Sequence, residues 1–205
     1  KNENRRFTAL AFMGLGMVFY GLLLMKDGFK PIREIEEFHQ AFEWFDAATF
    51  SGVLKCVLIG SVLTAIVQSS SATLGITIAI AAQGVISYET AVALVLGQNI
   101  GTTVTAALAS IGTTTVARRA AYFHILFNTL GVLMVLIVFR FYVDGVGWVV
   151  EALRDIDPHS LDPQHPDFAV NMTFAIAMAH TIFNVLVTVV NVPLVGPWAR
   201  LLERL

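Results

Sequence analysis

The residues best suited to chemistry in this chain form a short polar run inside an apolar stretch. They are Gln68, Ser69, Ser70, Ser71 and Thr73. Apolar residues precede the run from Val62 and follow it to Ala82. Polar side chains at membrane depth are costly unless they line a cavity or bind a ligand. We therefore interpret the run as a site for small ions.

A second polar group lies about thirty positions further along, within Gly97–Thr103. Its polar side chains are Gln98, Asn99, Thr102 and Thr103. Hydroxyl and amide oxygens suit a hard cation such as sodium. A half-helix that begins just after Ser69 would instead offer free N–H groups and a positive dipole end to an anion. Broken helices can serve both ions within one site.

Structural roles compete with this interpretation. Serine and threonine in membrane helices often bond back to carbonyls or hold neighbouring helices together. Gly97–Thr103 fits a helix-packing kink as well as an ion site. For the run at 68–73, an unbroken helix would turn some of the polar groups toward lipid, which favours a break there.

Two further pairs of polar residues repeat one pattern. His124 and Asn128 are four positions apart, as are His180 and Asn184, and a Phe precedes each Asn. Residues with this spacing share one face of a helix. They are candidates to support the ion site from behind, and the alternatives are satisfied structural histidines and asparagines that bond between helices.

The composition indicates where these residues operate. The 205 residues are 56% hydrophobic and 14% charged, with a mean hydropathy of +0.72. Soluble domains are about a quarter charged, so we expect an integral membrane protein. The net charge of −2, with no basic patch among aromatics, excludes nucleic acid as a partner. Phosphate-loop, nucleophile-elbow and zinc-protease motifs are missing, so we expect no enzyme activity.

The hydropathy pattern predicts an all-α membrane protein with transmembrane helices, a re-entrant helical hairpin and discontinuous helices. We expect one transmembrane transport domain over 1–205, multi-pass in the cell membrane. Arg118 and Arg119 favour a cytoplasmic position for their end of the span. The expected elements are a span at 7–25, an interfacial helix at 34–46, a re-entrant hairpin at 51–86 broken at 68–71, a discontinuous helix at 87–111 broken at 97–103, a span at 117–142, an aqueous loop at 155–167 and a span at 168–192.

Four motifs in order resemble the type II sodium/phosphate cotransporters and their bacterial relatives. They are Gln68–Ala72, Gly97–Thr103, Arg118–Asn128, and His180–Asn184 with Pro193 downstream. The resemblance covers nearly the whole chain. It implies two inverted repeats, each with a Gln-Ser-Ser element, that face each other near the midplane of the membrane.

The resemblance also implies roles for individual residues. Gln68, Ser69, Ser70 and Ser71 would bind phosphate. The residues that would bind sodium or support its site are Thr73, Gln98, Asn99, Thr102 and Thr103.

The chain departs from the family pattern by carrying a single Gln-Ser-Ser-Ser element, and by having Gln98 where many first repeats have Ala. We therefore expect one repeat of an inverted-repeat transporter, either the second half of a longer protein or a half-size protein that dimerises. The expected function is sodium-coupled transport of inorganic phosphate by alternating access. The alternatives are a non-transporting regulatory or scaffold module, and a sodium-coupled carrier of another small anion.

Overall fold

The computed structural model describes residues 2–29 and 45–203, and within these residues the chain is helical with no strand. The all-α membrane architecture predicted from the sequence is confirmed. The interfacial helix expected at 34–46 lies almost entirely outside the described residues. In chain order the elements are α1 (Asn2–Phe29), α3 (Phe50–Val67), α4 (Ser70–Ala81), α5 (Tyr88–Ala109), α6 (Thr115–Ile137), α7 (Phe139–Arg154), α8 (Phe168–Asn191), the short 3₁₀ helix η2 (Val192–Leu194) and α9 (Val195–Leu202).

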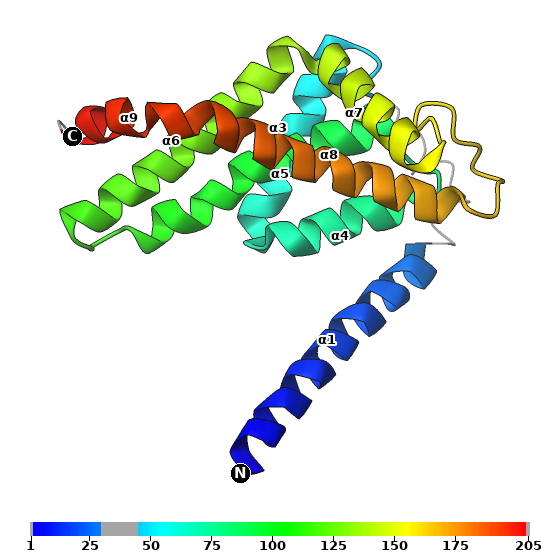
Figure 1. Cartoon of the computed structure of the whole chain (residues 1–205), viewed down its shortest axis with the longest axis horizontal. Helices are drawn as coiled ribbons and strands as arrows, with labels where there is room; N and C mark the ends of the chain where they lie inside the picture. Colours follow the sequence, from blue (N-terminus) through cyan, green and yellow to red (C-terminus); the bar gives the residue numbers. More distant parts are fainter. Residues whose placement is uncertain (1, 30–44, 204–205) are drawn as a thin grey trace.

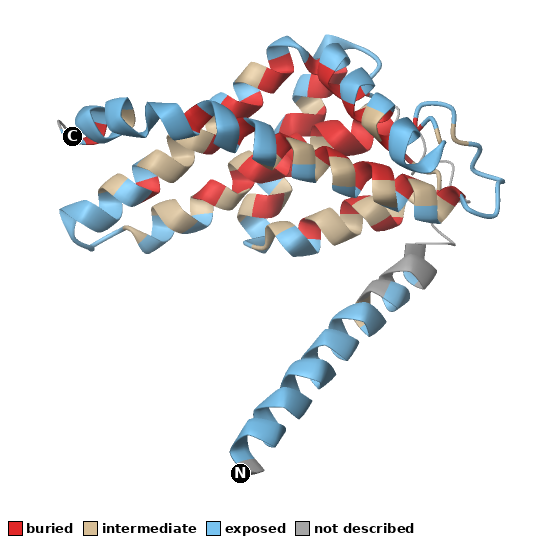
Figure 2. Cartoon of the chain, in the orientation of Figure 1, coloured by how far each residue is buried: buried red, intermediate tan, exposed pale blue. Residues whose placement is uncertain are grey.

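Four helical segments in the described part of the chain are long and apolar enough to cross a membrane. They are α3, α5, α6 and the continuous run Phe168–Leu202, which joins α8, η2 and α9. α3 and α6 carry exposed apolar side chains on their outer faces, such as Leu58 and Leu133. α1 extends away from the other helices, and side chains such as Phe12 and Met17 are exposed along it (Figures 1 and 2).

The helix α5 lies at the centre of the molecule and contacts α3, α4, α6 and α8 (Figure 1). Its side chains from Tyr88 to Leu96 are almost completely buried, except for the partly exposed Glu89 and Leu94. Ile176 and Phe183 of α8 complete the same core. Because α5 is enclosed on several sides, it is the element against which the four neighbouring helices pack.

Glycines allow α3 and α5 to approach unusually closely. A Cβ added at Gly97 would overlap the carbonyl oxygen of Val57, and one at Gly60 would overlap that of Leu94. Ser61 Oγ donates to the carbonyl oxygen of Gly97 at 2.9 Å across the contact. Small residues at a helix interface bring two backbones together in this way.

This packing explains why the break predicted at 97–103 is wrong. α5 runs without interruption from Tyr88 to Ala109. Gly97 is used for the contact with α3, and a Cβ at Gly101 would likewise overlap the carbonyl oxygen of Ser61. The glycines that suggested a discontinuous helix are therefore packing positions.

The span expected at 117–142 also ends earlier than predicted. α6 ends at Ile137, and α7 begins at Phe139 in a new direction (Figure 1). The junction residue Val138 leaves the helical conformation, with φ −114° and ψ 26°. Arg140 Nη2 then donates to the carbonyl oxygen of Ala48 at 2.8 Å, which ties the junction to the segment before α3.

The loop at 155–167 folds back over the ends of α4 and α5. His159 Nδ1 lies 2.6 Å from Glu89 Oε1, and its ring stacks edge-on against Tyr88. Gly147 of α7 leaves room for the His159 ring, since a Cβ there would lie 2.9 Å from Nε2. α7 itself is held to α8 by Tyr142, whose hydroxyl donates to the carbonyl oxygen of Ala179. Burial raises the pKa of Tyr142 above its ordinary value, so it stays a donor.

Candidate functional site

The helical path breaks at Gln68 and Ser69, within the run that the sequence singled out. Gln68 caps α3 in the left-handed conformation, with φ 55° and ψ 26°, and its N–H donates to the carbonyl oxygen of Thr64. This conformation costs a residue other than glycine roughly 1–2 kcal/mol. Backbone strain of this kind concentrates at functional sites.

The next helix, α4, begins with a capped but incompletely satisfied end. Ser69 is extended and its Oγ accepts from the Ala72 N–H at 3.3 Å. The first N–H groups of a helix have no partner within the helix, so those of Ser70 and Ser71 remain for a ligand. The side chains of Gln68, Ser71 and Ala72 are exposed, and those of Ser69 and Ser70 are partly exposed. The end of α4 is therefore an open, electropositive surface.

Beneath this end lies a buried polar layer contributed by three helices. Thr73 is completely buried, and its hydroxyl lies 3.0 Å from that of Thr64 on α3. Thr73 Oγ1 also lies 3.1 Å from the carbonyl oxygens of Ser69 and Ser70, to which it can donate. Thr64 then acts as donor to Thr73. These contacts fix the first turn of α4 on the last turn of α3.

Gln98 joins the same layer from α5. Its Nε2 donates to the carbonyl oxygen of Thr73 at 3.2 Å and to Thr77 Oγ1 at 2.7 Å. A carbonyl oxygen only accepts, so the amide orientation follows from these bonds. Gln98 is only 2% exposed, and its Oε1 has no hydrogen-bond partner within the described residues. A buried acceptor without a partner costs free energy, and a donor or a cation would remove that cost.

Three other predicted sodium residues have their polar groups engaged with their own helix. Asn99 Nδ2 donates to the Val95 carbonyl oxygen at 2.8 Å. Thr102 and Thr103 donate to the carbonyl oxygens of Gln98 and Ile100, respectively. Their side-chain oxygens still have acceptor capacity. Among the predicted sodium residues, the structure joins Thr73 and Gln98 directly.

The histidine and asparagine pairs make hydrogen bonds within their own helices. Asn128 Nδ2 donates to the His124 carbonyl oxygen at 3.1 Å, and Asn184 does the same to His180 at 2.8 Å. No hydrogen bond among the described residues links either pair to the Gln68–Thr73 run. Their contacts satisfy the amides within α6 and α8.

Sequence reasoning missed three hydroxyl residues of the site. Ser61 and Thr64 lie on the side of α3 that faces α5 and α4, and Thr77 lies one turn after Thr73 on α4. Their spacing of three or four residues on apolar helices is a signal that they share one face. The sequence alone does not say that the three faces meet.

The arrangement combines two chemistries. The C-terminal end of α3 presents carbonyl oxygens, and the N-terminal end of α4 presents N–H groups and serine hydroxyls. A cation fits the carbonyl, hydroxyl and amide oxygens, and a small oxyanion fits the N–H groups. Such adjacent helix ends are typical of secondary transporters.

Comparison with known proteins agrees with this class. The Na+/Pi-cotransporter family model matches residues 36–151. The chain therefore belongs to the Na+/Pi-cotransporter family.

Several relatives share part of their length with the chain. It is 31% identical to the uncharacterized protein YqeW of Bacillus subtilis (strain 168), over 95% of this chain and 56% of that protein. It is 32% identical to YjbB of Escherichia coli (strain K12), provisionally named an inorganic phosphate export protein, over 60% of this chain and 22% of that one. It is 39% identical to the sodium-dependent phosphate transport protein 2C of Rattus norvegicus, over 44% of this chain and 16% of that protein. No solved structure gives a significant match.

Proposed function

We propose that this chain supplies one half of a site for sodium-coupled transport of inorganic phosphate. The break at Gln68–Ser69, with the buried layer of Thr73 and Gln98 beneath it, is the observation that carries the proposal. The names of two relatives, which specify phosphate export and sodium-dependent phosphate transport, support phosphate as the transported anion.

Phosphate binds at the N-terminal end of α4. The N–H groups of Ser70 and Ser71 and the serine hydroxyls donate to its oxygens, and the positive end of the helix dipole favours its charge. Gln68 lies beside them and provides an amide donor. No arginine or lysine occurs within residues 68–73, so a bound cation supplies the remaining positive charge.

Sodium binds in the polar layer just below the phosphate. Gln98 Oε1 provides a buried oxygen without a partner among the described residues, and the hydroxyls of Thr64, Thr73 and Thr77 belong to the same hydrogen-bonded layer. Sodium in this layer would neutralise part of the phosphate charge. Phosphate affinity therefore depends on sodium.

A second Gln-Ser-Ser element completes the site. The chain spans 56% of its Bacillus subtilis relative and less of the others, and its own phosphate-binding end is exposed. The second element comes from another repeat half of a longer protein or from a second copy of this chain. Rocking of one half against the other then exposes the site alternately to each side of the membrane.

Uptake of labelled phosphate into proteoliposomes with an inward sodium gradient tests the proposal. We expect uptake with sodium and little with choline. Ser70→Ala removes a donor to a charged ligand, which should lower uptake about tenfold. Thr105→Ala, at an exposed position on α5 away from the break, is the control and should leave uptake unchanged. Equal uptake in sodium and choline would reject sodium coupling, and full activity of the Ser70 variant would reject the site.

A further inference from the structure

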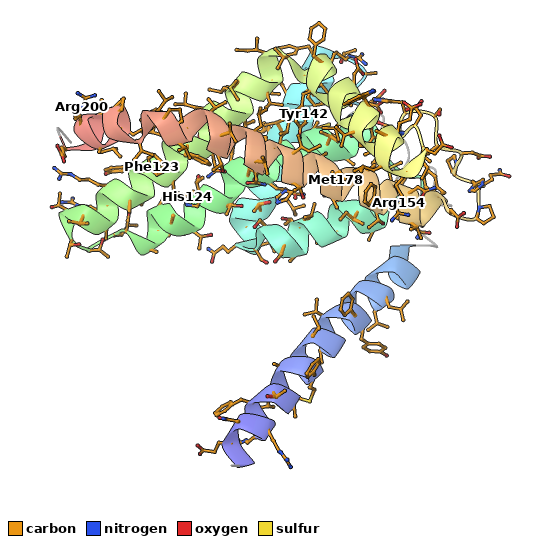
Figure 3. The ribbon with its side chains drawn as sticks, viewed as in Figure 1. Phe123, His124, Tyr142, Arg154, Met178 and Arg200 are labelled. Atoms are coloured by element: carbon orange, nitrogen blue, oxygen red, sulfur yellow. The ribbon has the colours of Figure 1, made fainter. Side chains whose placement is uncertain are left out.

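A groove of about 360 Å³ lies between α6 and α9. Figure 1 shows α9 and the start of α6 at the end of the molecule opposite the 155–167 loop. Its walls are mostly apolar. They include Val116, Ala120 and Phe123 of α6 and Val195, Trp198 and Leu202 of α9. Figure 3 shows Phe123 between the two helices. The Phe123 and Trp198 rings stack edge-on, with centroids 6.4 Å apart.

One cation, Arg119, is part of the groove wall. Its Nη2 donates to the carbonyl oxygen of Glu203 at 2.8 Å, and its Nε has no partner within the described residues. A guanidinium carries five N–H donors and binds the oxygens of a phosphate group in pairs. Arg119 therefore retains capacity for an anionic group that enters beside it.

The surroundings place this cation where a membrane interface is expected. Arg119 lies in the second turn of α6, one of the membrane-crossing helices, so the positive end of that helix dipole is close to it. Trp198 donates its ring N–H to Asn191 Oδ1 at 3.1 Å, which leaves its apolar ring on the groove. Tryptophan and arginine together are typical of the headgroup level of a bilayer.

We propose that this groove binds one anionic phospholipid. An acyl chain lies along the apolar wall between Phe123 and Trp198, and the phosphate group binds Arg119. Basic pockets between transmembrane helices bind anionic headgroups in this way. Glu203 also lines the groove. Its negative charge repels the anionic headgroup and so limits the affinity for the lipid. A free phosphate ion gains nothing from the apolar wall, which is why the occupant is a lipid. The proposal is independent of the transport function.

Tryptophan fluorescence provides the test, because Trp198 is part of the groove wall. The full chain carrying Trp44→Phe and Trp148→Phe has Trp198 as its single tryptophan. It is reconstituted into phosphatidylcholine vesicles that contain small fractions of phosphatidylglycerol or phosphatidylcholine with brominated acyl chains. Bromine quenches a tryptophan that it touches. We expect brominated phosphatidylglycerol to quench Trp198 at an about fivefold lower fraction than brominated phosphatidylcholine.

Variants separate the groove from general surface charge. Arg119→Gln should abolish the preference for phosphatidylglycerol, whereas Arg118→Gln removes the same charge from a neighbour outside the groove and should keep most of it. Glu203→Gln should strengthen the preference. Ala199→Phe fills the groove and should weaken quenching by both lipids.

Several results would overturn the proposal. Equal quenching by both lipids in the parent chain would show that the groove does not select anionic lipid. If Arg119→Gln and Arg118→Gln reduced the preference for phosphatidylglycerol equally, that preference would be due to general surface charge. Absence of quenching by either lipid would mean that protein covers the groove, and relief of quenching by millimolar inorganic phosphate would identify a free-anion site instead.

Discussion

At the scale of single residues, Gln68 combines two properties that usually conflict. It holds a left-handed backbone conformation, for which glycine is the inexpensive choice, yet it carries a long polar side chain. The side chain is exposed beside the open end of α4. The presence of glutamine rather than glycine at this strained position favours a role for the side chain in binding over a role in the turn itself.

Replacement of Gln68 separates these two properties. Gln68→Gly should raise the free energy of unfolding by about 1 kcal/mol because the strain is released, while sodium-dependent phosphate uptake falls. Gln68→Ala keeps most of the strain and should lose uptake without the gain in stability. Thermal unfolding in detergent and uptake in proteoliposomes measure the two effects. A glycine variant that is both more stable and fully active would argue against a binding role for the side chain.

At the scale of helices, the contact between α3 and α5 sets the position of the polar layer. Gly60, Gly97 and Gly101 let the two backbones touch. The layer of Thr64, Thr73 and Gln98 is built directly on this contact. A change of helix separation should therefore affect ion binding as well as stability.

Gly97→Ala tests this dependence. The added Cβ overlaps the carbonyl oxygen of Val57, so α3 must move away, and we expect a loss of about 1–3 kcal/mol in stability. Gly145→Ala in α7 is the matched control, because no atom of the described residues lies within 4 Å of its Cβ position. That change should be neutral or slightly stabilising, since alanine favours a helix over glycine. Equal unfolding temperatures for the two variants would contradict the tight-contact model.

The contacts of His159 with Glu89 and Tyr88 give a second prediction at the scale of helices. His159→Ala removes the 2.6 Å contact with Glu89 and the ring contact with Tyr88. We expect amide hydrogens in 155–167 to exchange up to about fivefold faster, because a single hydrogen bond contributes about 1 kcal/mol. His165→Ala is the control, since its ring contact is to Asp167 within the loop. Unchanged exchange in the His159 variant would show that other contacts hold the loop.

The sequence predicted the helical class and the break at Gln68 because both follow from local signals. Hydropathy marks apolar helices, and a dense polar run cannot be accommodated in one lipid-facing helix. The break at Gly97–Thr103 was predicted wrongly because glycine serves both turns and close packing. Whether Gly97 makes a turn or a close contact depends on the position of α3, which is a separate helix. Thr64 and Thr77 were missed for the same reason: their partners are on other helices.

At the scale of the whole molecule, the proposed phosphate-binding end of α4 is not enclosed by the described part of this chain. Ser71 and Ala72 are exposed, whereas Thr73 just below them is completely buried. A site that excludes water from a charged substrate needs a second surface over this end. The proposed second Gln-Ser-Ser element would provide it.

Cross-linking can detect that second surface. Cys56 is the single cysteine and is buried, so Cys56→Ser provides a background for new cysteines. In proteoliposomes that take up phosphate without any other protein, Ala72→Cys should form cross-linked dimers with a short bis-maleimide. Leu58→Cys, on an exposed apolar face of α3, should not. Uptake by chains that never cross-link through position 72 would exclude this dimer arrangement.

The close contact between α3 and α5 also has a consequence for how the chain is made. α4, which lies between them in sequence, has 12 residues and spans only about 18 Å, against roughly 30 Å of hydrocarbon. During synthesis α3 leaves the ribosome before its packing partner α5 does, and α4 is too short to cross the bilayer alone. We therefore expect the three segments to enter the membrane as one unit once α5 has emerged. Nascent chains arrested while α5 is still inside the ribosome should remain bound to the insertion machinery, whereas chains long enough to expose Ala109 outside it should be released into lipid.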